Sequence, residues 1–541
     1  MGISRWRWLV AVLGAATLLA AACGSSSDDA TTAGTGNGGS GTTTAGSVTV
    51  PEVTVPQSAE YTGEAVADPT KLPTDLDGWE ALWKTQRDAV IQRIKDNKWG
   101  VSADGKTLTG PEGFAVDLSA CPDGWNSAEG LSDTEIKIGQ TIAQSGTFAV
   151  AANYGKGQDA IFQYYNGKGG FTDSTGKTRK VTYTQKDDGY DPAKTVPLVD
   201  ELLNADKVFS LVTLGSPNIM KTYDKVNQRC VPQVFSQSGH PAWGDPANHP
   251  WTSGGLLNYA TEAGLWGKFI EDRAAEFPDK FTIAALVVNN EFGKIYDASF
   301  RAWLEQSPIK DRINYVTETV DPQAPTITNQ MTTLAAENPS VFIAEAAATF
   351  CPQSAQEAYQ NGMHETVKYL FQPNTCAGSS QLSKEKVGGD GSASEGWWIV
   401  NGGTKDIRDA ALQEDPMVIW GRQMITDHGE DPDSSTELGL GLMHGWAYVQ
   451  SLLIAGELEG GLNRANLLLA ARTLDTNNPF QLGGMVWHVN GNADSYYTEG
   501  GLFQQYDVSK QSYVSRTEVF NLDGQSKNCN FDTSTSTCKL Y

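Results

Sequence analysis

Short apolar runs alternate with helix-like segments between about residue 133 and residue 235. The runs rich in β-branched and aromatic residues, which are typical of buried strands, lie at 136–139, 181–184, 208–212 and 231–235. The segments with helical spacing of apolar residues lie between them, at 160–165, 193–204 and 218–228. Repeated strand–helix–strand units predict a parallel sheet with helices on both faces.

The same alternation returns in the second half of the chain. The elements expected there are strands at 281–288, 341–344 and 369–371 and a helix at 296–305. A further strand at 397–400 and a helix at 440–455 do not complete a third unit, so we expect them to finish the first two. The prediction is an α/β fold of two Rossmann-like lobes with parallel-sheet cores, joined by a multi-strand hinge. Ligands of open α/β sheets lie beyond the carboxyl ends of the strands, which places one site in the cleft between the lobes.

The region before the first lobe begins with one amphipathic helix. Apolar residues recur at helical spacing over 75–96, with Asp77 as the expected N-cap, and loop-like sequence follows to about residue 132. We therefore expect an N-terminal extension, 61–132, that docks through this helix.

The first residues predict where the protein goes. Arg5 and Arg7 precede an apolar run over 8–22, which is short for a membrane span of about 20 residues and typical of a signal peptide. The run ends in small residues directly before Cys23 and resembles the lipobox of bacterial lipoproteins, although Ala20 stands where leucine is usual. An ordinary secretory signal cut near Ala22 is the alternative.

The sequence after Cys23 is rich in Gly, Ser and Thr and predicts a disordered tether over 23–60. A flexible tether behind a lipid anchor is what a membrane-tied soluble domain needs. We therefore predict a signal peptide over 1–22, lipid on Cys23, and a protein exported and anchored to the outer face of the bacterial cytoplasmic membrane.

Net charge excludes one class of partner. The 541 residues include 64 Asp or Glu and 40 Lys or Arg, a formal net charge of -24, and no basic cluster offsets it locally. Such a chain repels phosphate backbones, so we expect no nucleic-acid partner. The acidity fits solubility of an exported surface.

The chain has seven cysteines, and lipid on Cys23 leaves six, which can pair in about 15 ways. Cys529 and Cys538 flank a short polar loop and form a natural local pair. Cys351 and Cys376 can join neighbouring segments, which leaves Cys121 with Cys230; the list of expected disulfide cysteines is Cys121, Cys230, Cys351, Cys376, Cys529 and Cys538. No C-x-x-C or H-E-x-x-H pattern occurs, so we expect no metal site and no cofactor.

An exported hydrolase is the main alternative from another class. The sequence has no G-x-S-x-G elbow and no P-loop pattern. Asp187 and Asp188 are paired carboxylates in sequence, but adjacent residues at a strand end point to opposite sides, so a turn or helix cap is the favoured interpretation. Asp191, before Pro192, is well suited to cap the helix at 193–204.

Several motifs occur in the order and at the spacing of one known family. They are EIKIG at 135–139, AQSG at 143–146, Tyr154-Gly155, NGKGG at 166–170, DDGYDPAK at 187–194, GSP at 215–217 and GHP at 239–241. With them, residues 133–520 resemble ABC-transporter substrate-binding proteins of the branched-chain amino-acid-binding type. The resemblance implies the type I periplasmic-binding-protein fold, capture of a small solute between hinged lobes, and delivery to a membrane permease, with no catalysis.

The resemblance also implies ligand-binding positions. They are Ser145, Gly146, Ser216, Gln237, Ser238, Gly239 and Phe292. Hydroxyls and backbone N–H groups at strand ends and helix starts can hold a polar head. Each position also has a purely structural interpretation. Residues 145–146 can simply form a turn, the polar residues at 216 and 237–239 can cap helices, and Phe292 can pack under the hinge.

Two positions depart from the family pattern. Asn374 stands where members that bind α-amino acids place an acid, and Ala347 stands where an aromatic residue is common; Glu345 can replace the missing charge or be a strand-end residue. We therefore expect a solute other than a simple branched-chain amino acid, a carboxylate or amide with a larger apolar body. Trp243 and Trp251 can wall such a body or anchor a long loop.

The predicted organisation follows from these observations. Lobe 1 comprises about 133–255 and 400–495, lobe 2 comprises about 256–399 and 496–520, and a C-terminal tail with a local disulfide spans 521–541. The expected partners are a small-molecule solute and a permease, and a monomer is expected. A lipoprotein that senses its ligand without transporting it is the remaining alternative.

Overall fold

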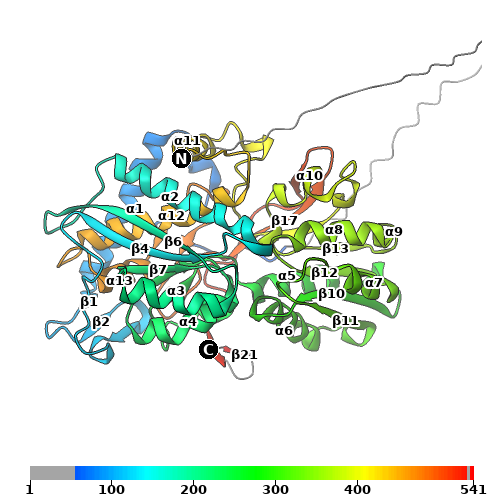
Figure 1. Ribbon diagram of the computed structural model, residues 1–541, viewed down its shortest axis with the longest axis horizontal. Coiled ribbons are helices and arrows are strands. Elements are labelled where there is room, and N and C mark those ends of the chain that lie inside the picture. The colour runs from blue at the N-terminus through cyan, green and yellow to red at the C-terminus, as the bar shows by residue number, and fades with distance from the viewer. Residues whose placement is uncertain (1–54, 533–536, 541) are drawn as a thin grey trace, which may run out of the picture. The chain divides into compact units, whose positions relative to one another are not determined.

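The computed structural model describes residues 55–532 and 537–540 (Figure 1). The predicted signal peptide, Cys23 and most of the predicted tether lie outside these residues. All the described residues belong to one compact unit, in which two sheets lie side by side (Figure 1). We call the part around the sheet of β4 lobe 1 and the part around the sheet of β10 lobe 2.

Lobe 1 is built on a sheet of order β5-β6-β4-β7, in which β4 is parallel to β6 and β7. A bridge between Leu214 and Gln237 joins β7 to β8, which pairs with β9. The strands are β4 (Glu135–Ile142), β5 (Phe171–Thr172), β6 (Thr178–Asp187), β7 (Ser210–Thr213), β8 (Gln233–Ser236) and β9 (Thr252–Gly254). The intervening helices are α2 (Ala152–Gly167), α3 (Pro192–Asn204) and α4 (Ser216–Gln228). As expected, Asp191 caps α3 by accepting from the Ala193 N–H at 2.9 Å.

Lobe 2 is built on a sheet of order β11-β10-β12-β13-β14-β17-β18, whose first five strands are parallel and whose last two are antiparallel to their neighbours. The strands are β10 (Phe281–Val288), β11 (Ile313–Val320), β12 (Val341–Glu345), β13 (Tyr369–Phe371), β14 (Trp398–Asn401), β17 (Gly500–Asp507) and β18 (Ser512–Ser515). The helices are α5 (Tyr259–Asp272), α6 (Glu291–Gln306), α7 (Thr328–Ala336), α8 (Phe350–Gln360), α9 (Met363–Thr366) and α10 (Lys384–Val387). The chain passes between the two lobes after β9, after β14 and before β17, so several segments form the hinge.

Returning chain completes lobe 1 with α11 (Pro416–Asp427), α12 (Glu437–Glu457) and α13 (Arg464–Ala471). α12 lies directly against α2, because Gly157 and Gly441 lack the Cβ atoms that would meet backbone carbonyl oxygens of the facing helix at 2.1 and 2.2 Å. Among the described residues, α12 is the helix long and apolar enough to span a membrane, but 89% of its apolar window is buried inside the protein. It is the core helix of lobe 1.

The N-terminal extension packs on lobe 1. Its helix α1 (Leu76–Asp96) inserts Trp83 against Trp446 of α12, with ring centroids 5.2 Å apart. The N-cap of α1 is Asp75, which accepts from the Gly78 N–H at 2.8 Å, so the expectation of Asp77 was wrong by two residues. A small sheet of β1 (Gly100–Val101), β2 (Thr107–Thr109) and β3 (Ala115–Asp117) follows.

Three disulfides join the six cysteines in the pairs that the sequence favoured. They are Cys121–Cys230, Cys351–Cys376 and Cys529–Cys538, with Cα atoms 5.7, 5.7 and 5.2 Å apart. The first ties the extension to lobe 1. The second ties the start of α8 to the segment after β13, and the third joins β20 (Cys529–Asp532) to β21 (Thr537–Leu540).

Candidate functional site

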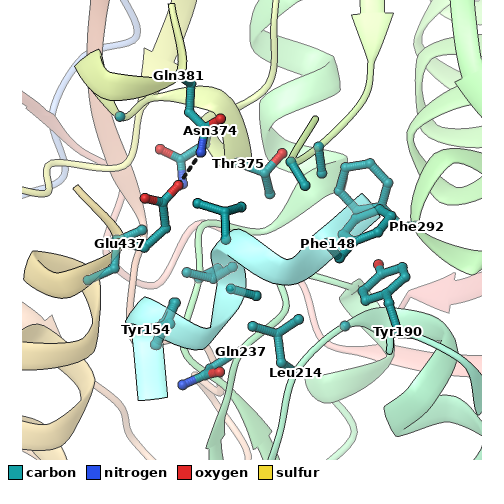
Figure 2. Close-up of a pocket in the computed structure, with 18 of the residues that line it drawn as sticks. Phe148, Tyr154, Tyr190, Leu214, Gln237, Phe292, Asn374, Thr375, Gln381 and Glu437 are labelled. Carbon is teal, nitrogen blue, oxygen red and sulfur yellow. Dashed lines mark hydrogen bonds between the residues drawn. The ribbon is translucent and has the colours of Figure 1, made fainter. Parts of the chain in front are cut away.

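A cavity lies between the lobes, beyond the carboxyl ends of four parallel strands (Figure 2). Leu214 and Gly215 follow β7, Gln237 follows β8, Ala347 follows β12, and Asn374 follows β13. The cavity measures about 110 Å³, several times the space of about 10–15 Å³ that one water needs on the same measure. It therefore has room for a small organic molecule that touches both lobes.

Stacked aromatic rings form one wall of the cavity. Phe148, in the 3-10 helix Gly146–Ala151, stacks on Tyr190 with centroids 3.7 Å apart and planes 7° apart. Phe148 also meets Phe350 of lobe 2 edge-on, at 6.4 Å. Gly215 makes this wall possible, because its φ is +94° and a Cβ there would lie 2.3 Å from the Tyr190 ring. The Phe148 ring is thus contacted by Tyr190 of lobe 1 and by Phe350 of lobe 2.

A second aromatic pair comes from the first turns of two lobe 2 helices. Tyr259 of α5 and Phe292 of α6 meet edge-on with centroids 5.4 Å apart, and both line the cavity. Burial raises the pKa of Tyr259 to about 12, against hydrogen bonds with Ser238 and Ser216 that favour the charged form. Tyr259 is therefore a neutral phenol that points toward the two serines.

Three of the predicted ligand-binding residues lie behind Tyr259 rather than in the lining. Ser216 and Ser238 are fully buried, with their hydroxyl oxygens 2.9 Å apart, and a Cβ at Gly239 would lie 1.9 Å from the Leu257 carbonyl oxygen. The lining includes none of these three. The family resemblance assigns these polar groups to a ligand carboxylate. In this protein they face the phenol of Tyr259 instead.

Ser145 and Gly146 also lie outside the cavity lining. Both are exposed, and Ser145 bonds with Asp187, whose carboxylate also accepts from the Gln144 N–H at 2.8 Å. Asp188 accepts from the Tyr190 N–H at 2.9 Å, so the paired carboxylates serve turns, as expected. These bonds shape the loops that present the aromatic wall.

Glu345 does not supply a charge to the cavity. It is fully buried in lobe 2, where the Tyr315 hydroxyl lies 3.5 Å from it, and the lining does not include it. Burial and the nearby Asp297 carboxylate both raise the pKa of Glu345. Trp243 and Trp251 are buried outside the lining, so they anchor their loop.

The predicted residues that do line the cavity are Gln237, Phe292, Ala347 and Asn374. The side chain of Gln237 donates to Gln158 at 2.8 Å. The side-chain oxygen of Asn374 accepts from the Gly402 N–H at 2.9 Å, and its backbone N–H donates to Glu262 at 2.6 Å. Both amides are thus held by the protein.

Glu262 of α5 is a buried acid that sequence analysis missed. It accepts from the Tyr296 hydroxyl at 2.6 Å as well as from Asn374, and burial raises its pKa to about 8. It stands behind the lining and fixes the position of Asn374. No motif in the sequence marks it.

Glu437, the first residue of α12, lines the cavity and was also missed (Figure 2). Its carboxylate accepts from Gln381, in the segment between β13 and β14 of lobe 2, and from Ser435. Burial raises the pKa of Glu437. The Gln381–Glu437 bond therefore joins the two lobes at the cavity.

Two further bonds join the lobes beside the aromatic wall. The Thr147 hydroxyl donates to the Pro322 carbonyl at 2.9 Å, and the Gln323 side chain donates to the Gly189 carbonyl at 3.3 Å. The lobes are thus in contact on both sides of the cavity.

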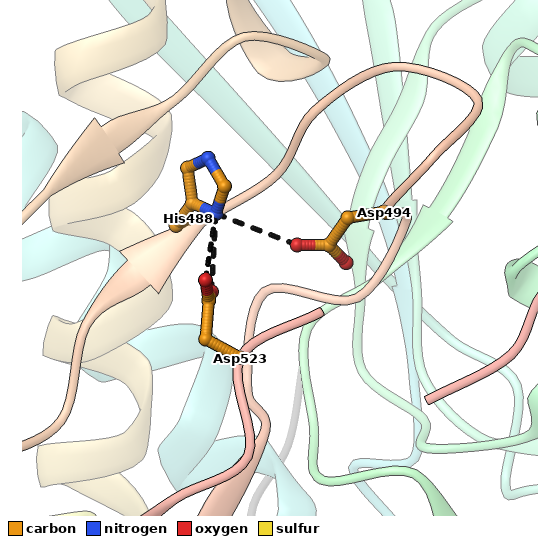
Figure 3. A group of neighbouring side chains, drawn as sticks. All are labelled: His488, Asp494 and Asp523. Atoms are coloured by element: carbon orange, nitrogen blue, oxygen red, sulfur yellow. Dashed lines mark hydrogen bonds and ion pairs between the residues drawn. The ribbon is translucent and has the colours of Figure 1, made fainter. Parts of the chain in front are cut away.

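A separate polar cluster outside the cavity lining brings together His488, Asp494 and Asp523 (Figure 3). The His488 Nδ1 lies 3.1 Å from Asp523 and 3.4 Å from Asp494. Burial alone would lower the pKa of His488, but the two carboxylates outweigh it and raise the pKa to about 10. One imidazole and two carboxylates are a set that can hold a metal ion, and the same three side chains form an ion-pair lock when the imidazole carries a proton.

The comparisons with known proteins agree on one family. The profile of a family described as periplasmic binding protein matches residues 135–495. No curated protein sequence matches the chain.

Three solved structures illustrate the similarity. A fatty acid ABC transporter substrate-binding protein from Thermomonospora curvata is 17% identical, with a TM-score of 0.59, over 74% of this chain and 96% of that one. A branched-chain amino acid ABC transporter protein from Thermus thermophilus with bound valine is 14% identical, with a TM-score of 0.61, over 72% and 97%. A solute-binding protein from Rhodopseudomonas palustris BisB5 in complex with 3,4-dihydroxybenzoic acid is 15% identical, with a TM-score of 0.57, over 72% and 98%. Since the family profile covers most of the chain and these neighbours share its two-lobed architecture, the chain belongs to the periplasmic binding protein family and has the type I fold.

Proposed function

We propose that this protein is the extracytoplasmic solute-binding component of an ABC importer, which captures a small solute between its lobes and delivers it to a permease. The cavity carries the proposal, because residues of both lobes line it at the carboxyl ends of their parallel strands. A solute there favours the closed arrangement in proportion to its differential affinity for the closed and open states.

The proposed solute is amino-acid-like, a carboxylate or an amide, with an apolar body, and it differs from a simple branched-chain amino acid. Asn374 and Ala347 support this part of the proposal, because both line the cavity where an acid and an aromatic residue are expected in binders of α-amino acids. Calorimetry with leucine and valine tests it. We expect no binding at low micromolar concentration, and binding there would contradict the proposed solute class.

The proposal includes export and a lipid anchor on Cys23, with the protein acting as a monomer. The variant Cys23→Ser should leave the membrane fraction while keeping the solute affinity of the wild type. A variant that still fractionates with lipid would show that the anchor lies elsewhere.

Two measurements separate transport from the alternatives. Native mass spectrometry of the purified protein should find a retained small molecule, and incubation with that molecule should return it unchanged; conversion of the molecule would indicate a hydrolase. Deletion of the protein should abolish uptake of the same solute. Retained uptake, with a lost response to the solute, would indicate a sensor.

A further inference from the structure

The cavity lining carries one charge sign. Among the described residues that line it, Glu437 is the one carboxylate, and none is Lys, Arg or His. Burial raises the pKa of Glu437 and no cation among these lining residues counters that effect, so a cationic solute would stabilise its charged form and an anionic solute would oppose it. Burying an uncompensated charge of this kind is costly.

The uncharged donors on the side of the cavity next to the start of α4 are engaged as well. Ser216 and Ser238 bond with each other and with Tyr259, whose ring stands between them and the cavity. Gln237 donates to Gln158. The side of the cavity next to the start of α4 therefore presents an aromatic ring where a ligand carboxylate would need N–H or O–H donors.

The opposite side presents an acceptor. Both carboxylate oxygens of Glu437 are fixed by donors, one by Gln381 and one by Ser435, yet each carboxylate oxygen can accept more than one hydrogen bond. Glu437 lines the cavity, and Figure 2 shows its carboxylate directed at Gln381 at the cavity's edge. It is an oriented acceptor with lone pairs left for a further donor.

Aromatic rings line much of the remaining space. Phe148, Tyr154, Tyr190, Tyr259 and Phe292 belong to the lining, and Figure 2 shows Phe148, Tyr190 and Phe292 together on the side away from Glu437. The faces of such rings attract cations, and aromatic cages are a recognised means of binding alkylammonium groups. The carboxylate offers a cation an ion pair at one side of the cavity, and the rings offer an apolar body and polarisable faces at the other.

We propose that the cavity selects a cationic amine with an apolar body and rejects carboxylates of the same size. This inference rests on the proposed import function, keeps the apolar body of its solute, and replaces the carboxylate or amide head with a cationic amine. The ammonium group contacts Glu437, and the apolar body lies between the aromatic rings. Since Glu437 belongs to lobe 1 and Gln381 to lobe 2, the ammonium group would sit at a contact that forms when the lobes close.

The experiment uses three probes that share a phenyl ring and differ in their head: 2-phenylethylamine, 3-phenylpropanamide and 3-phenylpropanoate. Calorimetry on the wild-type protein should give an affinity at least tenfold higher for the amine than for the carboxylate. Glu437→Gln should reduce the affinity for the amine at least tenfold and change that for the amide by less than threefold. Glu437→Asp should restore part of the amine affinity.

The control is Glu457→Gln, which removes an exposed carboxylate from the other end of the same helix and should leave all three affinities unchanged. Thermal unfolding checks that each variant is folded. Equal or tighter binding of the carboxylate, or unchanged amine affinity in folded Glu437→Gln, would overturn the inference. Small-angle scattering, which reports whether the lobes close, separates the two proposals. If a solute without an amine closes the lobes, the amine selectivity alone is refuted. If no solute of a broad panel closes them, both the solute-binding function and the amine selectivity are refuted.

Discussion

The ring of Phe148 lies flat on the ring of Tyr190, with centroids 3.7 Å apart, and the edge of Phe350 in the other lobe meets it at 6.4 Å. Stacked pairs contribute about 0.5–1.5 kcal/mol beyond the area that they bury. Since this stack is both a wall of the cavity and a contact between lobes, its loss should affect solute binding and closure together.

Phe148→Ala is therefore expected to weaken solute binding at least tenfold and to lower the unfolding temperature. Calorimetry with the solute retained by the purified protein measures the first effect, and thermal unfolding measures the second. Phe148→Leu keeps most of the apolar volume and should lose less affinity. Equal affinity in the alanine variant and the wild type would remove Phe148 from the binding site.

Ser216→Ala should leave the solute affinity within a factor of two of the wild type. The Ser216 hydroxyl is buried against Ser238 and does not line the cavity, although the family resemblance assigns it to the ligand. The variant should lose about 1 kcal/mol of unfolding free energy, the usual contribution of one buried hydrogen bond. A clear loss of affinity without a change in stability would return Ser216 to the site.

Glu262→Gln should change how stability depends on pH. Burial raises the pKa of Glu262 to about 8 from 4.5, so the folded state holds a proton that the unfolded state releases as pH rises from about 4.5 to 8. Wild-type stability contains a contribution that falls over this range. The glutamine variant should lack that fall and gain up to about 5 kcal/mol relative to the wild type at pH 9, because one pKa unit corresponds to about 1.4 kcal/mol.

Urea unfolding of both proteins at pH 5, 7 and 9 tests this expectation. Tyr296 and the Asn374 N–H keep a partner in the variant, since a glutamine oxygen and amide can accept and donate in place of the protonated carboxyl. A stability difference that does not grow with pH would contradict the assigned pKa.

His488→Gln tests a basic group, for which the pH dependence of stability arises from a proton held by the folded state at high pH. The pKa of His488 is raised to about 10 by Asp494 and Asp523, which outweigh the effect of burial. The stabilisation by the imidazolium is therefore fully present below about pH 6.5 and is lost as pH rises through about 10. The variant should unfold at a lower temperature than the wild type at pH 6, and the two should converge above pH 10.

A chelator provides the control for this cluster. If the three side chains form an ion-pair lock, EDTA leaves the wild-type unfolding temperature unchanged at pH 7. A rise in unfolding temperature on adding Zn²⁺, absent in His488→Gln, would instead identify a metal site.

Sequence patterns predicted the elements that are buried on both faces. The strands β10 and β13 have the bounds expected from their apolar runs, and α3 begins at its expected cap, Asp191. β11 was missed because it is an edge strand whose residues are mostly half-buried, so its sequence INYVTETV lacks an apolar run. α5 was also missed, although it supplies Tyr259 and Glu262 to the site.

The candidate site was predictable only where it follows from strand ends. Gln237 and Asn374 line the cavity because they come directly after β8 and β13. Phe148, Tyr190 and Glu437 reach it through the way loops and α12 pack between the lobes, which no local pattern encodes. These residues are buried by partners that lie far away in the sequence, and such long-range contacts cannot be read from local sequence patterns.

The N-terminal extension is attached to lobe 1 at three points. Tyr61 bonds with Asp475, α1 packs on α12, and Cys121 is joined to Cys230, and all of these partners belong to lobe 1. Just before the extension, Ser58 and Ala59 bond with Asn521, whose strand β19 (Phe520–Asn521) pairs with β17 of lobe 2. The extension should therefore move with lobe 1, while the chain that leads into it is also tied to lobe 2.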